Sequence, residues 1–139
     1  MEISNHEIVF QSKGNCDLID LTARVNSLIQ ETGMQIGHAL MFVPGATGGI
    51  TTIEFESGLV RDFRELWEKL VPSGINYHHD ERWGDGNGHS HLRASLIGPS
   101  LTVPFEGGRL RLGTWQQVIF IDFDNRPRRR TIAVQLCGK

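Results

Sequence analysis

The chain has 139 residues, a formal net charge of -2 and a hydrophobic fraction of 39%. This length suits one ordinary domain, so we expect a single domain over residues 1–139. The weakly acidic balance argues against a nucleic-acid partner, and no apolar run approaches the ~18–20 residues that cross a membrane. No secretory signal is visible, and Cys16 and Cys137 form neither a disulfide framework nor a metal motif, which favours a reduced, cytoplasmic setting.

The first half of the chain alternates strand and helix patterns. Apolar residues at helical spacing predict two helices, the first capped by Asp17 or Asp20 and ended by Gly33, and the second ended before Pro72. In chain order we expect a strand over 7–12, a helix over 17–31, a strand over 37–43, a loop over 44–49, a strand over 50–55 and a helix over 58–70.

The second half carries short strand patterns between turn-forming residues. Residues 89–96 fit either a short helix or an irregular turn. Strands are expected over 101–104, 109–112, 117–123 and 131–136, with turns over 106–108 and 124–127. Helices in the first half and antiparallel-looking strands in the second predict an α+β fold, a compact single domain with mixed or antiparallel sheets and two main helices.

Histidines concentrate in one turn-rich segment. Four of the six lie between Tyr77 and His91. Imidazole titrates near neutral pH and is the commonest metal ligand, so the segment predicts a site for metal binding, proton transfer or anion recognition. His89 and His91 are two residues apart and converge only on an extended backbone or where the chain bends, as at a helix start. Asn87 could cap such a helix, whose first N–H groups favour an anion.

His79 is the natural third member of this cluster. Together with His89 and His91 it offers three imidazoles, one arrangement that holds zinc with an open coordination position. The spacing alone leaves a structural alternative equally open. In that alternative the rings cap loops and pair with nearby carboxylates at Asp80, Glu81 or Asp85.

Four further features have both a plain and a functional interpretation. The loop 44–49, with Gly45 and Thr47, is either a tight loop or a concavity of main-chain N–H groups that binds an anion. Glu54 is an exposed residue, a general base or a partner to a histidine. Trp115 belongs to the core or stacks on a planar ring. The arginine-rich run 126–130 is a solvated turn or a phosphate clamp.

Two motifs give the chain a family resemblance. Residues 85–100, Asp-Gly-Asn-Gly-His-Ser-His-Leu-Arg-Ala-Ser-Leu-Ile-Gly-Pro-Ser, come first, and Gly-Arg-Leu and Leu-Gly-Thr-Trp-Gln follow within 108–116. In this order they resemble the YjbQ-like family, some members of which are described as secondary thiamine-phosphate synthases. The resemblance covers most of the chain. It implies a compact α+β domain assembled as a homotrimer, with a histidine cluster near the subunit interface as the site.

The resemblance implies an enzyme that joins a pyrimidine diphosphate to a thiazole phosphate and releases diphosphate. A divalent metal, zinc or magnesium, would assist, and the partner would be a small phosphorylated molecule. For this function we predict catalytic roles for Glu54, His89 and His91, metal or leaving-group binding by His79, His89 and His91, and substrate or phosphate contacts by Gly45, Thr47, Arg93, Arg109 and Trp115.

The chain departs from the family pattern at two places. Ile53 precedes Glu54 where members usually have Asn, and Gly45-Ala46-Thr47 stands where many have His-Thr-Thr or His-Thr-Ser, so the first histidine of that motif is absent. Two alternative functions therefore stay open. One is a non-catalytic trimeric protein that binds a metal or an anion, and the other is a metal-dependent hydrolase of unrecognised substrate.

Overall fold

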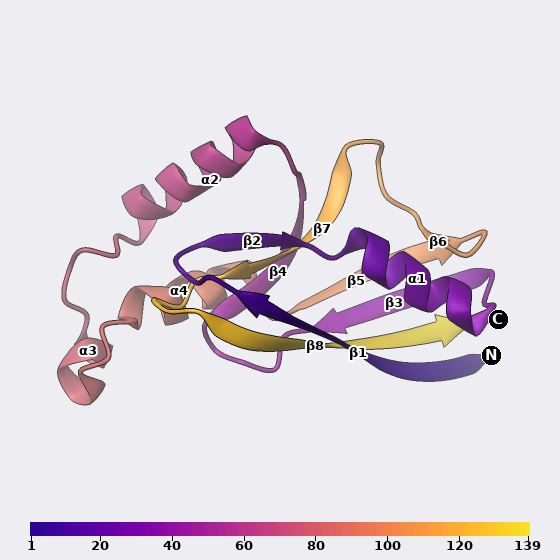
Figure 1. The fold of residues 1–139 in the computed structure, drawn as a ribbon, viewed down its shortest axis with the longest axis horizontal. Coiled ribbons are helices and arrows are strands. Elements are labelled where there is room, and N and C mark those ends of the chain that lie inside the picture. Colours follow the sequence, from indigo (N-terminus) through magenta and orange to yellow (C-terminus); the bar gives the residue numbers. More distant parts are fainter.

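The computed structural model describes residues 1–139 as eight strands and four helices (Figure 1). The strands are β1 (Glu2–Ser12), β2 (Asp17–Asp20), β3 (Ile36–Phe42), β4 (Gly48–Glu54), β5 (Ser100–Glu106), β6 (Arg109–Leu110), β7 (Gln116–Asp122) and β8 (Arg128–Gly138). The helices are α1 (Thr22–Thr32), α2 (Ser57–Leu70), α3 (His78–Trp83) and α4 (Gly88–Ile97). Every predicted strand and helix has a counterpart, the α+β class is confirmed, and β2 and α3 are additions.

The start of the first helix was predicted wrongly. Residues 17–20 form β2, which pairs antiparallel with β7 from Asp17↔Asp122 to Asp20↔Ile119, and the helix begins only at Thr22. Tertiary pairing here overrides a local helical pattern. Asp20 still serves the helix, because its carboxylate accepts the Thr22 backbone N–H at 2.9 Å. The predicted stop is confirmed by Gly33, which adopts a left-handed φ of 76°.

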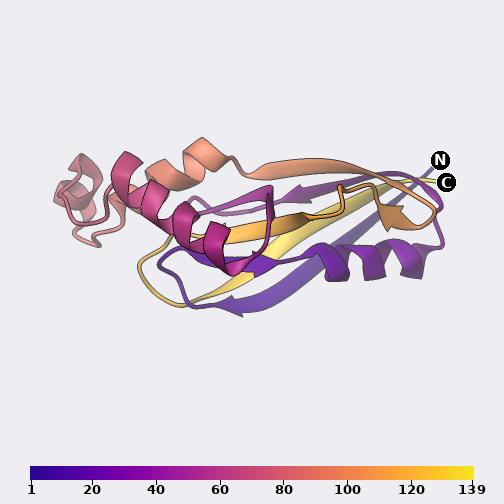
Figure 2. The same cartoon turned by 90° about the horizontal axis from the view of Figure 1, so that it is seen from above.

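The strands form two sheets in which every pairing is antiparallel. One sheet has five strands in the order β1-β8-β3-β5-β6, and the other has three in the order β2-β7-β4. β1 and β8 pair along their whole length, from Glu2↔Gly138 to Ser12↔Arg128, so the two chain ends lie side by side (Figures 1 and 2). The same pairing brings the start of β8 next to the end of β1.

Two apolar cores lie on either side of β7. The larger core joins the inner face of the five-stranded sheet, one face of β7 and helix α1, and includes Phe10, Val25 and Phe120. The smaller core joins the other face of β7 to α2 and α4 through Ile121, Trp67 and other residues. Burial on both faces explains the continuous apolar run in β7. The end of β7, at Asp122, is therefore also buried in the interior.

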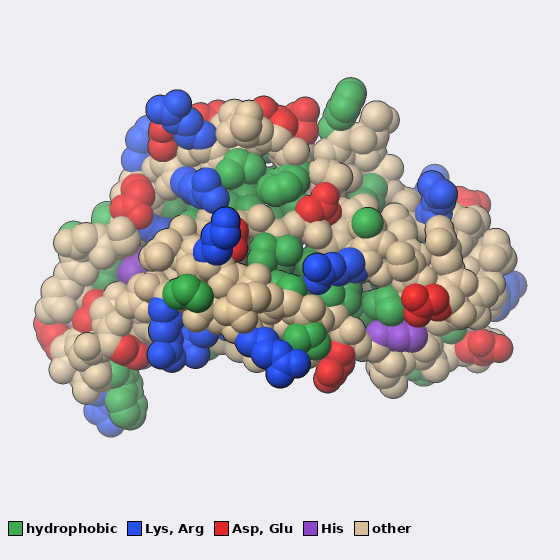
Figure 3. Space-filling model, in the orientation of Figure 1, with side chains coloured by type: hydrophobic (Ala, Val, Ile, Leu, Met, Phe, Trp, Pro, Cys, Tyr) green, Lys and Arg blue, Asp and Glu red, His purple; other side chains and the backbone are tan.

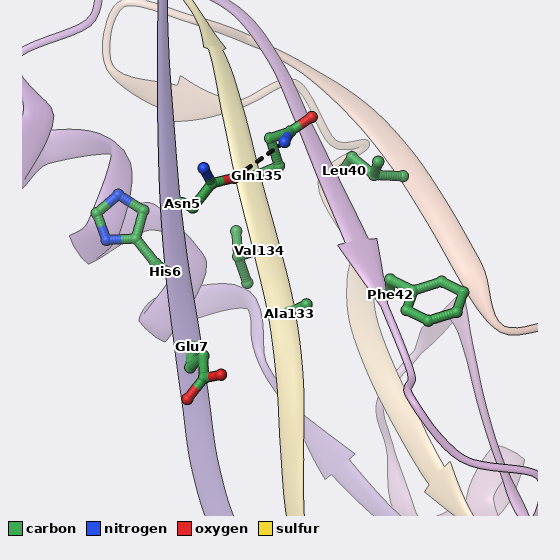
Figure 4. A pocket seen from close by; sticks show the side chains of 8 residues that line it. All are labelled: Asn5, His6, Glu7, Leu40, Phe42, Ala133, Val134 and Gln135. Carbon is green, nitrogen blue, oxygen red and sulfur yellow. Dashed lines mark hydrogen bonds between the residues drawn. The ribbon is translucent and has the colours of Figure 1, made fainter.

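Two surfaces of the molecule remain open. Helix α2 buries only Trp67, and its outward side carries charged residues (Figure 3). The outer face of the five-stranded sheet exposes Ile3, Val9 and Phe42. A shallow hollow of about 620 Å³ crosses β1, β8 and β3 on this sheet (Figure 4). Neither surface lies at the histidine segment.

Candidate functional site

The histidine segment folds as two short helices joined by a glycine turn. Gly84 and Gly86 adopt φ of 69° and 67°, a left-handed backbone that glycine reaches without strain. Asp80 of α3 stabilises the turn. Its carboxylate accepts hydrogen bonds from the backbone N–H of Tyr77 at 3.0 Å and from that of Gly88, the first residue of α4, at 2.8 Å. These two bonds hold the pKa of Asp80 below its usual value. The N-terminus of α4 is thereby partly occupied by a side chain of the protein itself.

Two histidines of this segment come together. His79 of α3 and His91 of α4 place their ring centroids 4.4 Å apart, and both rings are partly buried. Burial lowers the pKa of His91, and the neighbouring His79 lowers it further. His91 is therefore neutral at pH 7 and able to accept a proton. His78, by contrast, is fully exposed and contacts Glu81.

His89 does not join this pair. Helix α4 runs from Gly88, and side chains two apart on a helix diverge by roughly 200°. The His89 side chain is buried, its Nδ1 has no hydrogen-bond partner, and its Nε2 lies 3.4 Å from the Ser90 hydroxyl. No group of three or more His, Cys, Asp or Glu side chains is placed to hold a metal ion. The residues of this chain thus do not supply the three-histidine ligand set, and the metal stays a prediction.

A chain of hydrogen bonds fixes the orientation of His79. Asn87 stands at the start of α4, but its side chain makes no cap bond. Its Nδ2 donates to Oδ1 of buried Asp124 at 3.4 Å, and its Oδ1 lies 3.1 Å from Nε2 of His79. A carboxylate only accepts, so the amide oxygen must face the ring, and His79 carries its proton on Nε2. The lone pair of neutral His79 is therefore on Nδ1.

Asp124 belongs to a set of paired charges, Asp122, Asp124, Arg128 and Arg130, which we call the carboxylate–arginine cluster. Both carboxylate residues are fully buried. Arg128 donates from Nε to Asp124 at 2.9 Å, and Arg130 holds the two oxygens of Asp122 through Nε and Nη2, each at 2.7 Å. Burial alone would raise the pKa of Asp124, but donors that include the Asn125 N–H, Arg128, Asn87 and Thr47 hold it below its usual value.

The cluster was not predicted from the sequence. The sequence of the run 126–130 fits either a solvated turn or a phosphate clamp. Strand β8 settles its geometry: Arg128 and Arg130 point inward to the carboxylates, whereas Arg129 is exposed. The alternation of side chains along a strand could have signalled this, together with the two aspartates of β7 and the turn after it.

The loop between β3 and β4 forms one wall of a cleft beside His91. The cleft has a volume of about 410 Å³ and is lined by Gly45, Ala46, Gly48, His91, Ala94, Ser95 and Pro99. Gly45, predicted to contact phosphate, thus lies near the histidine pair. The Thr47 hydroxyl turns inward, donating to Asp124 at 3.1 Å and accepting from Arg130 at 2.8 Å. The family histidine missing at position 45 would stand in this same cleft.

Arg93 is occupied elsewhere. Its side chain is 4% exposed and donates to the Val71 carbonyl from Nε at 2.9 Å and from Nη2 at 2.8 Å, and its Nη2 also contacts Glu68 at 2.8 Å. These bonds tie α4 to the end of α2. The arginine therefore has a structural role within the chain, and its two bonded nitrogens point to protein acceptors.

The remaining predicted residues lie away from the histidines. Glu54 and Trp115 are exposed at the far end of the three-stranded sheet, where Glu54 pairs with Gln116. Gly48, at the cleft end, is six residues earlier on the same strand, which corresponds to about 20 Å. Arg109 is exposed on β6, the edge strand of the other sheet. A single chain thus does not join these three residues to the cleft.

Comparison with known proteins agrees with this arrangement of fold and motifs. A family model described as "UPF0047 protein YjbQ-like" matches residues 6–139. This chain belongs to the YjbQ-like family. A UPF0047 protein of Archaeoglobus fulgidus is 38% identical over 129 residues, covering 93% of this chain and 98% of the relative. The UPF0047 protein YugU of Bacillus subtilis is 37% identical, covering 88% of this chain and 90% of the relative.

Solved structures of other proteins share the fold. A protein of Sulfolobus solfataricus, described as of unknown function, superposes with a TM-score of 0.92 at 27% identity, covering 99% of each chain. A hypothetical protein of Aeropyrum pernix gives a TM-score of 0.89 at 29% identity, covering 98% of this chain and 99% of that one. In this member of the family, no helix is long and apolar enough to cross a membrane.

Proposed function

We propose that this chain is an enzyme acting on a small phosphorylated molecule in the cleft beside His91. The observation that carries the proposal is the pair His79–His91. The orientation of the His79 ring is fixed by a hydrogen bond to Asn87, which is itself bonded to buried Asp124. A group that exchanges protons needs a fixed tautomer and an accessible partner atom. The chain supplies both next to a cleft of about 410 Å³, which suits a small molecule.

The reaction that the family resemblance implies fits this site. A bond forms between a thiazole nitrogen and a pyrimidine methylene carbon, and the carbon–oxygen bond to diphosphate breaks with its electron pair on oxygen. Negative charge builds on the departing diphosphate, and aligned donors stabilise it. We assign the donor role to His91 and the positioning of its neighbour to His79. A phosphate-ester hydrolysis would use the same two residues, with His91 accepting a proton from water.

The first test is turnover by single variants. The purified chain is incubated with the pyrimidine diphosphate and thiazole phosphate, and in parallel with simple phosphate monoesters, while diphosphate or phosphate release is recorded. His91→Ala should lower kcat by roughly 10²- to 10⁴-fold, the usual loss for a proton-transferring group. His78→Ala is the matched control, because this histidine is fully exposed beside the pair. Full activity of the His91 variant, or no activity of the wild type on either substrate class, contradicts the proposal.

A divalent metal, zinc or magnesium, is a separate proposal that no catalytic step above requires. Elemental analysis of wild type and of the double variant His79→Ala/His91→Ala tests it directly. Stoichiometric metal that is lost in the variant supports the metal. A stronger comparison uses Gly45→His, which places a third imidazole at the cleft and should raise zinc affinity. Equal zinc binding by Gly45→His and wild type would contradict a metal site at this position.

A homotrimer with a site shared between copies would explain the distant residues. Glu54 lies about 20 Å along β4 from the cleft, and the outer sheet face with Phe42 is exposed (Figure 4). We propose that a neighbouring copy brings Glu54 or Trp115 to the cleft of the first. Light scattering after size-exclusion chromatography measures the oligomeric state.

Mixing two inactive variants distinguishes a shared site from a site within one chain. Glu54→Gln and His91→Ala are unfolded together, refolded at equal amounts and assayed. If each site takes Glu54 from one copy and His91 from the next, then half of the sites have an intact Glu54. Half of these sites, chosen at random, also have an intact His91. About one quarter of wild-type activity should then return. No recovery above the separate variants contradicts the shared site.

A further inference from the structure

The guanidinium of Arg130 lies behind Gly45, which lines the cleft, and it belongs to the run 126–130, for which the sequence offers a phosphate clamp as one of two interpretations. Arg130 of β8 donates Nε and Nη2 to Asp122, and Nη2 also donates to the Thr47 hydroxyl at 2.8 Å. Its guanidinium carbon sits 5.8 Å from the centroid of the Phe120 ring. These contacts fix the plane of the guanidinium, and the side chain is only 13% exposed. The position of its remaining nitrogen, Nη1, is therefore set in advance.

Nη1 of Arg130 has no hydrogen-bond partner in the chain, in contrast to Nε and Nη2. It faces Gly45, where an added Cβ atom would stand 3.4 Å away. Gly45 also lines the cleft beside His91. A guanidinium held by a carboxylate on one side and free on the other is a common arrangement for binding an anion, since its N–H groups match phosphate oxygens in geometry and charge.

The glycine at position 45 is not required by its backbone. Gly45 is not among the residues with positive φ, so an alanine or a larger residue is conformationally allowed there. Arg130 does not itself line the cleft, and a side chain at position 45 would stand between the cleft and Nη1. The side chains of Lys and Arg also gather at the start of β8 on the surface in Figure 3, which favours approach of an anion.

We propose that Nη1 of Arg130 binds a phosphate or diphosphate group of the substrate, and that Gly45 is the residue that leaves this nitrogen open. That the anion is part of a substrate rests on the proposed function. Binding of an anion at this nitrogen does not itself require turnover. Asp122 and Thr47 are positioning residues that hold the guanidinium. This assigns to Arg130 a phosphate contact of the kind that one interpretation of the run 126–130 offers and that we predict for Arg93 and Arg109.

Binding of inorganic phosphate and of diphosphate tests the inference without any reaction. Isothermal titration calorimetry compares wild type with Gly45→Ala and Gly45→Leu. The leucine side chain should cover Nη1 and weaken binding by roughly 10- to 100-fold, the value of one or two charge-assisted hydrogen bonds. Alanine should have a smaller effect. Gly74→Leu is the matched control, because an added Cβ there meets nothing within 4 Å.

Arg130→Lys gives a second route that keeps a positive charge beside Asp122. The lysine should pair with the carboxylate but present no second nitrogen to the cleft, so diphosphate binding should fall as in Gly45→Leu. Arg129→Ala, on the same strand and the opposite face, should bind like wild type. Wild-type affinity in both Gly45→Leu and Arg130→Lys, or no phosphate binding by the wild type, overturns the inference.

The two proposals fail in different ways. His91→Ala should still bind diphosphate while losing turnover. If no variant and no wild type turns over substrate, yet Gly45→Leu loses diphosphate binding, the proposed function fails and the anion site stands. If turnover depends on His91 but diphosphate affinity is unchanged in Gly45→Leu and Arg130→Lys, the reverse holds.

Discussion

The two ends of the three-stranded sheet differ in the burial and hydrogen bonding of their polar side chains. At the end with Gly48 and Asp122, the carboxylates, Thr47 and Asn87 are buried and are bonded to one another or to the partly exposed Arg128 and Arg130. At the end with Glu54 and Gln116, polar groups are exposed, and Gln116 makes only short-range and cross-strand bonds to Gly113 and Thr52. The strands are the same, so strand identity does not decide the difference.

What differs is the number of chain segments that meet. Around Asp122 and Asp124 lie the end of β1, the loop after β3, the start of α4 and the start of β8. Each segment contributes a donor, and a buried carboxylate needs several. Nothing covers the far end, so its side chains use water. A buried polar site therefore forms where separate segments of the chain converge.

Removing the arginine of the buried end should have the largest effect. Arg130→Ala leaves Asp122 fully buried without its guanidinium partner, and breaking a buried pair in this way costs about 3–5 kcal/mol of unfolding free energy. Urea denaturation measures the loss. Arg129→Ala, exposed on the other face of β8, should stay within about 0.5 kcal/mol of wild type. Equal stability of the two variants would show that the cluster is not a structural unit.

A smaller loss is expected when the connection to the histidines is cut. Asn87→Ala removes one donor from Asp124 and the acceptor from His79, which should cost about 1–3 kcal/mol. The Asp85 carboxylate also lies 3.6 Å from Nε2 of His79, so the tautomer is read from the ring ¹⁵N chemical shifts of the wild type. Asn76→Ala, an exposed amide bonded to Glu81, is the matched control for stability. Wild-type shifts typical of the Nδ1–H form would contradict the assigned tautomer.

The sequence predicted the local features of the molecule better than its buried polar contacts. Periodicity located the strands, and the histidine-rich segment from Tyr77 to His91 pointed to His79 and His91, because these features are local. The polar contacts of the site are not local. Thr47 and Asp124 are 77 residues apart and Asn87 and Asp124 are 37 apart, so no spacing along the chain reveals them.

The differences between expectation and structure have the same physical origin. Residues 17–20 became a strand because β7 lies beside them. Arg93, expected at a phosphate, is instead buried against the Val71 carbonyl. His89 was grouped with His91 by spacing, but the regular helix α4 turns it elsewhere. In each case a partner distant in sequence decided which way the residue faces.

Acid should lower the unfolding free energy through the protonation of buried His89. Burial lowers the pKa of His89, with Arg93 lowering it further and Glu68, Asp80 and Asp124 opposing. Since the folded pKa lies below the unfolded value of 6.5, the unfolded state binds more protons between the two. The stabilisation is complete above pH 6.5 and is lost as the pH falls toward the folded pKa, with a slope of at most about 1.4 kcal/mol per pH unit.

Urea denaturation between pH 7.5 and pH 5 measures this slope. His91, with its own lowered pKa, should contribute in the same direction. His89→Gln has no titrating ring, so its stability should fall less steeply with acid than that of wild type. A slope for His89→Gln equal to that of wild type would show that His89 does not cause the loss of stability in acid.

The smallest effect is expected at the open end. Glu54→Gln and Trp115→Ala alter side chains that water already reaches, Trp115 being 72% exposed, so unfolding free energy should change by less than about 0.5 kcal/mol. Measurement at protein concentrations too low for assembly isolates the single chain. A loss that appears only at high concentration would mean that a second copy covers this end. The open end would then acquire the segments it lacks from a neighbour, which is how a site shared between copies would be built.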